Sequence, residues 1–430
     1  MSFQNTTPIF ALVAFLTPPV AYGQRLTLAQ ALAQTLQSSP ELASYSWNIR
    51  AAEARIIQAK LRPNPDLSIE SENITGSGDF KSADEMMENT LQLSQLVELG
   101  GKRTARVQEA QSERQLADWE YQIKSIDILR ETTTRFIEAL AAQRKFELAQ
   151  ETVSVAERVI PVTQRLLESG KASDVELTRA NVAVASARIE LEQSQRDLLT
   201  AKSNLAAQWG AREPDFTSVG GELAQLRPLP SIGHLKARLQ RNPQLARWTT
   251  EREKRQATLV SARAQGRPDV TLSVGPRLIG RGDDVTLVAG VSIPLPFWNR
   301  NQGAIAEAEA NVSKTADEQR NAEARAYAQL NEAYQRLSRA GNEANILERD
   351  VIPGARTAVD TLLDGYDRGR FSQLEVLEAR RTLNEARSQQ LRALADYHKA
   401  KAELDALTAA PIELSKPAAK ASLPPVTRKK

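Results

Sequence analysis

Side chains that are apolar at every position but Gln390 recur every seven residues along two stretches of this chain, and small side chains stand three positions after most of them. A strict seven-residue repeat predicts a left-handed coiled-coil seam, in which small residues let two helix backbones approach closely. An ordinary two-helix hairpin core would use the same stripe, but it would not explain why the stripe occurs twice. The positions are Leu177, Val184, Leu191, Leu198 and Leu205 with Ala180, Ala187, Ser194 and Ala201, then Val376, Leu383, Gln390, Tyr397 and Leu404 with Ala379, Ala386, Ala393 and Ala400.

Each seam lies on the return arm of a long helical hairpin. The pattern predicts helices over about 101–168 and 303–367, each followed by a glycine turn and a return helix that ends near 210 or 409. At 1.5 Å per residue such a helix is roughly 100 Å long, which no compact globular domain requires. Pro161 and Pro353 fall inside these helices, and they predict a kink or an irregular turn.

Shorter elements precede each hairpin. A helix over about 40–62, and another over 243–265, should end at a proline-containing segment. Alternating apolar and polar residues then predict a strand pair within 66–96 and a second pair within 268–293. The expected strands are 66–71, 91–96, 270–274 and 285–293, joined by loops over 74–89 and 278–284.

The two halves of the chain are copies of one unit. Leu32 to Asp66 matches Leu235 to Asp269 at a constant offset of 203, and the turns Gly170 and Gly369 match at an offset of 199. This self-similarity is typical of a tandem duplication, so each half should fold alike. We expect a signal peptide over 1–23, a first repeat over 24–210, a linker over 211–230, a second repeat over 231–409 and a disordered tail over 410–430.

The signal peptide is predicted from an eight-residue apolar run, Ile9 to Leu16, and from small residues Ala21 and Gly23 that suit cleavage before Gln24. The absence of Lys or Arg before the run departs from the usual pattern. The run is too short to span a bilayer, and no other apolar run reaches 18 residues. A membrane crossing would therefore have to be made of strands.

Charge and composition narrow the chemistry further. A net charge of +3 arises from 56 basic and 53 acidic residues without a basic block, so we expect no nucleic-acid partner. With no cysteine and two distant histidines, His234 and His398, the sequence contains no metal-ligand cluster and no catalytic motif. We therefore predict a protein that is not an enzyme and has no catalytic residues, metal site or other cofactor.

Four strands in one chain cannot close a barrel, and an open sheet edge is forbidden in lipid. Two chains would supply eight strands, and three would supply twelve, enough to leave a pore. At this point the chain resembles a known family, the TolC-like outer-membrane efflux proteins, and within it the cation-efflux-type components. The resemblance covers residues 26–409 and is carried by the duplicated glycine-turn hairpins together with Leu93-Ser94-Gln95, Leu99-Gly100-Gly101-Lys102-Arg103 and the run from Ile293-Pro294-Leu295-Pro296 to Asn301-Gln302-Gly303.

The resemblance implies a mainly α fold with a small β part. Tandem long hairpins would form an α-barrel tunnel, and four strands per chain would contribute to a trimeric twelve-stranded outer-membrane β-barrel. It implies a passive exit duct in the bacterial outer membrane, with its tunnel in the periplasm. The implied partners are two further copies of the chain, outer-membrane lipid, a periplasmic adaptor protein and an inner-membrane pump of the resistance-nodulation-division type, and the implied cargo is heavy-metal cations.

Two other classes of protein share part of this pattern. A periplasmic adaptor also contains a long helical hairpin, but normally one, inserted in a β-rich chain. A cytoplasmic coiled-coil scaffold would explain the heptads but would leave the signal peptide and the strand pairs without a purpose.

The two turns are the first candidate sites: Gly170, Lys171 and Ser173, then Gly369, Arg370 and Ser372. Each glycine is expected to end a helix in the left-handed conformation, and each serine to begin the next helix in a capping box with Glu176 or Glu375. The resemblance implies that these tips dock the adaptor. It also places Glu375 and Glu378 at a tunnel constriction, where carboxylate rings would favour cations.

Overall fold

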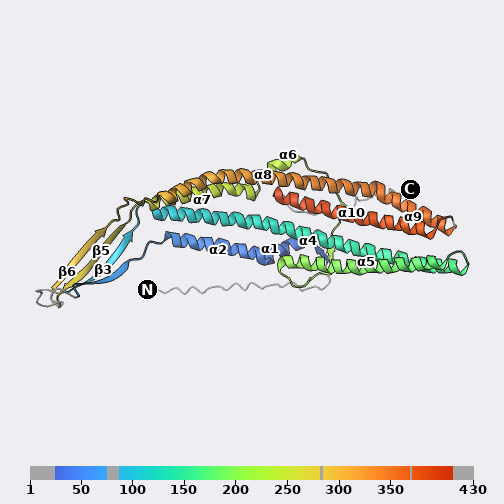
Figure 1. Cartoon of the computed structure of the whole chain (residues 1–430), viewed down its shortest axis with the longest axis horizontal. Coiled ribbons are helices and arrows are strands. Elements are labelled where there is room, and N and C mark those ends of the chain that lie inside the picture. Colours follow the sequence, from blue (N-terminus) through green and yellow to red (C-terminus); the bar gives the residue numbers. More distant parts are fainter. Residues whose placement is uncertain (1–24, 75–86, 281–283, 369, 410–430) are drawn as a thin grey trace, which may run out of the picture.

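A computed structural model describes residues 25–74, 87–280, 284–368 and 370–409. The predicted signal peptide, most of the first interstrand loop, the centre of the second, Gly369 and the predicted tail lie outside these residues. The chain is elongated, with a sheet at one end and two pairs of long helices running away from it (Figure 1). Within the described residues, no helix is long and apolar enough to cross a membrane.

The two repeats build the same order of elements. The first repeat places α2 (Pro40–Lys60) before β2 and β3, and the second places α7 (Pro243–Gln265) before β5 and β6. Both helices begin at a proline, and a polar side chain caps each: Ser39 accepts from the Leu42 N–H and Asn242 from the Gln244 N–H. The short helices α1 (Leu28–Ser38) and α6 (Ile232–Leu239), which the sequence analysis did not anticipate, stand before them.

The four strands form one antiparallel sheet in the order β2–β3–β5–β6, so β3 and β5 join the two repeats. The strands are β2 (Asp66–Glu72), β3 (Glu88–Val97), β5 (Val270–Ile279) and β6 (Asp284–Ser292). Strands β3 and β5 extend further toward the interstrand loops than predicted, so both loops are shorter. The apolar alternation fades there, but Arg277 forms an ion pair with Glu88 that holds the two strands together.

The long outgoing helices differ between the repeats. Helix α4 (Lys102–Glu168) remains α-helical through Pro161, so it contains no irregular turn there. In the second repeat, α8 (Gln302–Ile346) leads into a π-helical segment, η2 (Leu347–Val351), before α9 (Ile352–Asp367). Pro353 has no N–H, and its ring crowds the carbonyl four residues earlier, at Arg349 within η2. A wider π-helical turn relieves such crowding, so the predicted irregularity occurs here.

The return helices are α5 (Asp174–Ala206), extended by the 3₁₀ turn η1 (Ala207–Trp209), and α10 (Gln373–Leu407). Their heptad positions face the partner helices as predicted, since most of them are buried. The buried seam residues are Ala180, Val184, Ala187, Ser194, Leu198 and Leu205 on α5, and Val376, Leu383, Ala386, Ala393, Tyr397, Ala400 and Leu404 on α10.

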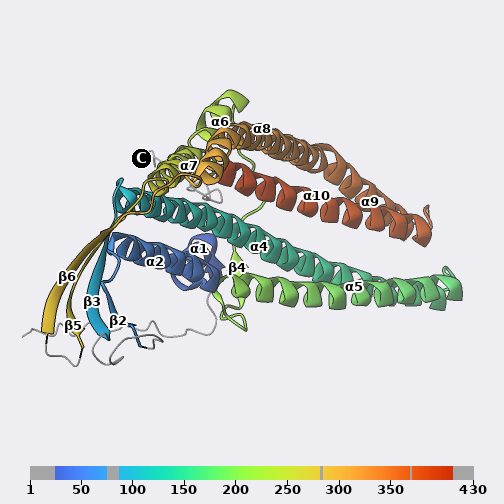
Figure 2. The ribbon, with the colours of Figure 1, turned by 60° about the vertical axis from the view of Figure 1, so that its left-hand side comes forward.

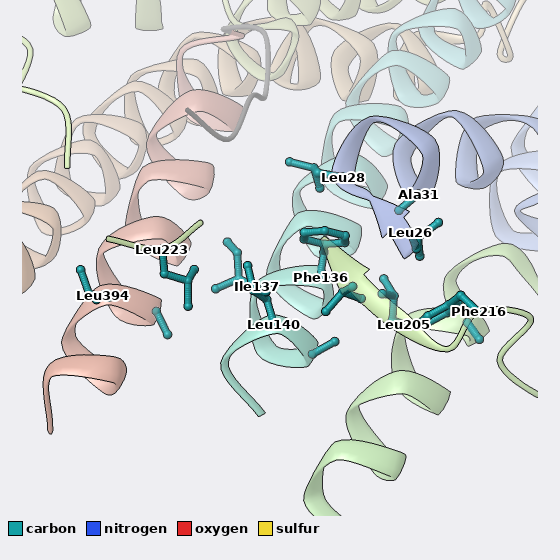
Figure 3. Close-up of a cluster of buried hydrophobic side chains, with 14 of the residues drawn as sticks. Leu26, Leu28, Ala31, Phe136, Ile137, Leu140, Leu205, Phe216, Leu223 and Leu394 are labelled. Atoms are coloured by element: carbon teal, nitrogen blue, oxygen red, sulfur yellow. The ribbon is translucent and has the colours of Figure 1, made fainter. Parts of the chain in front are cut away.

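The largest buried cluster lies midway along the long helices (Figure 3). Phe136, Ile137 and Leu140 of α4 meet Leu205 of α5 there, and all four are fully buried. The cluster also contains Val219 of β4 (Ser218–Gly220), which pairs in parallel with β1 (Arg25–Thr27). The segment 211–230 therefore contributes a strand and core residues at this level, and it is more than a connection between the repeats.

A second cluster supports the other hairpin. Leu235 and Leu239 of α6 pack against Leu330 and Leu337 of α8 and Leu404 of α10. The two clusters place most large buried side chains at the middle of the molecule, and the sheet and the hairpin turns lie at its two ends.

Candidate functional site

The two hairpin turns lie at the same end of the molecule, opposite the sheet (Figures 1 and 2). They end separate helix pairs, so they form two tips and not one cluster of side chains. The predicted site residues Gly170, Lys171 and Ser173 occupy the first tip. Arg370 and Ser372 occupy the second, whereas Gly369 is outside the described residues.

The first tip is a Schellman turn. Gly170 has a φ of +68°, a left-handed conformation in which side chains with a Cβ are strained. The Lys171 N–H donates to the Leu166 carbonyl at 2.8 Å, and the Gly170 N–H donates to the Leu167 carbonyl at 2.9 Å. Ser173 then caps α5, so the exposed Lys171 is held on a fixed backbone.

The second tip uses the same capping chemistry with an additional aromatic contact. The Arg370 N–H donates to the Gly365 carbonyl at 2.8 Å, and the Ser372 hydroxyl accepts from the Glu375 N–H. Phe371 packs on Gly365 so closely that a Cβ there would lie 2.2 Å from the ring. The first tip has Ala172 at the corresponding position, so this contact is specific to the second tip.

Glu375 and Glu378 lie one helical turn apart on α10, and the structure gives them different surroundings. The Ser372 N–H donates to the Glu375 carboxylate at 2.7 Å and the Ser372 hydroxyl at 2.9 Å, and these bonds lower the pKa of Glu375. Glu378 is exposed, and its carboxylate forms no hydrogen bond or ion pair with any described residue. Glu375 thus serves as a helix cap, while Glu378 has a free carboxylate.

A contact near the tips that the sequence analysis missed connects the two hairpins. The Gln373 side-chain amide donates to the Thr163 hydroxyl of α4 at 3.2 Å, and both residues are buried. Gln373 directly follows the cap residue Ser372, so the contact fixes the start of α10 against α4. A polar pair 210 residues apart leaves no local signal in a sequence.

A groove of about 1330 Å³ separates the two hairpins between the mid-level cluster and the tips. Apolar residues such as Val359 and Leu377 line it together with charged residues, among them Arg380. Arg380 is half-buried and forms no ion pair with a described residue. Burial lowers the pKa of its guanidinium, and the like charge of Arg158 lowers it further. This groove therefore contains a half-buried guanidinium that no described carboxylate pairs with directly.

The sheet has two chemically different faces. The register aligns the odd-numbered residues of β2 and β3 with the even-numbered residues of β5 and the odd-numbered residues of β6. That face is largely apolar and uncovered, with 76% of Ile69 and 75% of Leu287 exposed. Its members are Leu67, Ile69, Leu91, Leu93, Val97, Val270, Leu272, Val274, Leu278, Val285, Leu287 and Val291.

The opposite face is polar and contains a charged cluster toward the interstrand loops. Arg277 forms ion pairs with Glu88 at 2.7 Å and Glu72 at 3.5 Å, and its Nε donates to the Thr90 hydroxyl at 3.0 Å. Three neighbouring strands are thereby connected through one guanidinium. Nowhere among the described residues do three or more His, Asp or Glu side chains gather in a way that could hold a metal ion.

The two histidines are not brought into a common site. His398 is buried on α10, and its Nε2 lies 2.9 Å from the Leu223 carbonyl. Its neighbour Tyr397 donates to the Arg227 carbonyl at 2.9 Å and accepts from the Arg227 N–H at 3.1 Å. These two residues dock the segment between the repeats onto α10, whereas His234 is an exposed residue of α6.

Comparisons with known proteins agree with this architecture. A family model described as outer membrane efflux protein matches residues 31–211 and again residues 235–410. The chain is 31% identical to the cobalt-zinc-cadmium resistance protein CzcC of Cupriavidus metallidurans, over 93% of this chain and 97% of that protein. It is 24% identical to the nickel-cobalt-cadmium resistance protein NccC of Alcaligenes xylosoxydans xylosoxydans, over 70% of this chain and 68% of that protein.

Solved structures share the fold at lower identity. A structure of CusC has a TM-score of 0.74 at 16% identity and covers 90% of this chain and 93% of that chain. The outer membrane protein VceC of Vibrio cholerae has a TM-score of 0.71 at 19% identity, covering 90% of this chain and 97% of that chain.

Proposed function

The chain belongs to the outer membrane efflux protein family, and from this premise we propose that it is the outer-membrane exit channel of a tripartite efflux system. Three copies would place their sheets side by side as a twelve-stranded barrel, and their helices would form a tunnel in the periplasm. The family consists of transport components and not of known enzymes. We infer that an inner-membrane pump of the resistance-nodulation-division type supplies the energy, and that a periplasmic adaptor connects the pump to the tunnel.

The observation that carries this proposal is the two-faced sheet with two free edges. Its apolar face is uncovered within the chain, and its transfer into hydrocarbon would remove that area from water. Strands β3 and β5 have 10 residues each, the length that a tilted strand needs to cross a bilayer. In the described residues the outer edges of β2 and β6 have no partner strand, so the sheet requires neighbouring copies.

We infer that the cargo is divalent heavy-metal cations. The support is the likeness to the cobalt-zinc-cadmium and nickel-cobalt-cadmium resistance proteins, together with carboxylates on the polar face of the sheet and at Glu378. The metal would be transported and not retained. Deletion of the gene should lower tolerance of the host to cobalt, zinc or cadmium, and unchanged tolerance to all three would contradict this assignment.

We further propose roles for the predicted site residues. The capped tips around Lys171 and Arg370 would present exposed cations to the adaptor on a hydrogen-bonded backbone. Glu378 would form a ring of three carboxylates at the tunnel constriction; its side chain is exposed and has no ion pair with a described residue, so it is available for this role. Glu375 supports this ring by holding the start of α10.

Fractionation of cells that express the full chain tests the central proposal. A heat-sensitive trimer in the outer-membrane fraction that conducts ions in planar bilayers is the expected result. Recovery with the inner membrane would favour an adaptor, and recovery as a soluble rod would favour a coiled-coil scaffold. Either of these outcomes would replace the channel proposal.

A further inference from the structure

A polar joint connects the two repeats where β3 leads into α4. The Asp269 carboxylate accepts from the Leu99 N–H at 3.0 Å and from the Lys102 ammonium at 2.7 Å. Lys102 is only 6% exposed, so the ion pair is shielded from water. Beside it, Gly100 packs on Arg267, and a Cβ on Gly100 would lie 2.5 Å from that side chain.

The internal repeat places equivalent residues on the two free edges of the sheet. Gly101 precedes α4 with a φ of +77°, and Asn301, 200 positions later, precedes α8 with a φ of +62°. Asp66 is the first residue of β2. Asp269, 203 positions later, comes directly before the first residue of β5. Asn299 and Gln302 are thus equivalent to Leu99 and Lys102, and Asp66 is equivalent to Asp269.

These equivalent residues do not meet within one chain. Asp66 is on the edge formed by β2, while Asn299, Arg300 and Gln302 follow β6 on the opposite edge. All four are exposed, in contrast to the buried Lys102. Asp66 forms no ion pair with a described residue of its own chain.

We propose that the joint is repeated between subunits: the Asp66 carboxylate of one copy accepts from Asn299, Arg300 and Gln302 of the partner subunit. This inference rests on the proposed function, which brings β2 and β6 of neighbouring copies together. The sizes of the flanking residues agree with it. Within the chain, small Gly100 packs on large Arg267; between copies, large Arg300 would face Asn64, the shorter equivalent of Arg267. Within the chain Lys102 supplies the positive charge. Between copies Arg300, the equivalent of Gly100, would supply it instead.

The repeat also fixes the register of this contact. Within the chain, Leu93 lies opposite Val274. The equivalent pair between copies is Ile293 opposite Ser71 of the partner subunit. The same register puts Leu295 opposite the partner's Ile69. All of these apolar side chains are exposed in the single chain, and pairing would set them side by side on the apolar face.

Two prolines fit this register. The Gly280 N–H donates to the Met87 carbonyl at 2.9 Å, and the two residues lie opposite one another in the β3–β5 register. Because hydrogen-bonded pairs alternate in an antiparallel ladder, the odd-numbered residues of β3 direct their N–H groups toward β5. After β6 the equivalent odd positions Ile293 and Leu295 keep their N–H groups, whereas the Phe297 N–H donates to the Leu295 carbonyl at 2.9 Å and marks the end of the extended segment. Pro294 and Pro296, which have no N–H, occupy the even positions. At these positions no N–H points toward β2 of the neighbouring copy, so the prolines remove no hydrogen bond from the pairing.

Cysteine cross-linking tests the register directly, because the chain has no cysteine of its own. In the full-length protein in cells, Ser71→Cys with Ile293→Cys should give covalent dimers and trimers that a reductant returns to monomers. Leu93→Cys with Val274→Cys is the matched control: it should form a disulfide within one chain, detected as lost maleimide labelling without a change in size. Ile69→Cys with Ala289→Cys lies six residues out of register and should not cross-link.

Charge reversal tests the polar contact. Asp66→Arg and Arg300→Asp should each lower the temperature at which the trimer dissociates in detergent, and the double variant should regain part of the loss. Two results would overturn the joint but leave the channel proposal standing. One is a conducting trimer that cross-links only out of register. The other is a double variant whose trimer dissociates at a lower temperature than the trimers of both single variants. A non-conducting monomer would overturn both.

Discussion

The two repeats have the same order of elements, but they differ in how each element is held. The first outgoing helix is α-helical throughout, whereas the second contains a π-helical segment before Pro353. The first return helix has Leu198 and Leu199 where the second has Tyr397 and His398, which bind the segment between the repeats. The long helices of the two repeats thus have similar lengths, while their polar contacts differ.

The largest effect is expected at the joint between the repeats. Asp269→Ala would leave the buried Lys102 without a counter-charge, which costs about 3–5 kcal/mol. At the equivalent position, Asp66→Ala should change the unfolding free energy of the detergent-separated monomer by less than about 0.5 kcal/mol, because Asp66 is exposed when no neighbouring subunit is present. Urea unfolding followed by circular dichroism measures both. Lys102→Met with Asp269→Leu should recover most of the loss, and equal losses at Asp66 and Asp269 would refute the contrast.

A smaller effect is expected at the first tip. Gly170→Ala forces a Cβ into the left-handed region and should cost about 1–2 kcal/mol. The space around Gly170 is open, so the cost comes from the backbone alone. Gly170→Asn is the control, because asparagine tolerates this conformation better. If thermal unfolding showed the two variants to be equally stable, the left-handed conformation would not be the reason that Gly170→Ala destabilises the protein.

The next comparison concerns Glu378 and its first-repeat equivalent, Arg179. Glu378→Gln should lower the ratio of cation to anion permeability, on the order of threefold, because a carboxylate ring attracts cations in the tunnel. Arg179→Gln should change the ratio little or raise it. Reversal potentials in planar bilayers under a salt gradient give both values. An unchanged ratio in Glu378→Gln would remove this residue from the constriction.

The smallest effect is expected from His398. Burial lowers its pKa, while the hydrogen bond to the Leu223 carbonyl opposes that shift in part. The unfolded chain therefore binds the proton at a higher pH than the folded chain, and stability should fall as the pH drops below the ordinary histidine range. His398→Gln should flatten this dependence between pH 7 and 5. A profile that is the same in the variant would assign the acid sensitivity to other groups.

Local signals account for what the sequence predicted well. The heptads, the serine caps and the Gly170 turn each depend on residues within a few positions, and the structure confirms them. The contacts that were missed join distant residues: Gln373 to Thr163, Lys102 to Asp269, and β1 to β4. The strands β3 and β5 were predicted too short because Arg277 and Glu88 stabilise each other across the sheet, which a single-strand pattern does not reveal. The roles of Glu378 and the tips in transport stay predictions.

The position of the mid-level cluster has a mechanical consequence. Phe136 lies about halfway along α4, so roughly 50 Å of helix extends on each side of the mid-level cluster. β4 and the contacts of Tyr397 and His398 hold the connecting segment at the same level. A bend of about 10° in α4 at this level would move the end of the helix by about 9 Å relative to its other half, given that length. Small angular changes at the middle of the molecule therefore become displacements of several ångströms at the ends of its long helices.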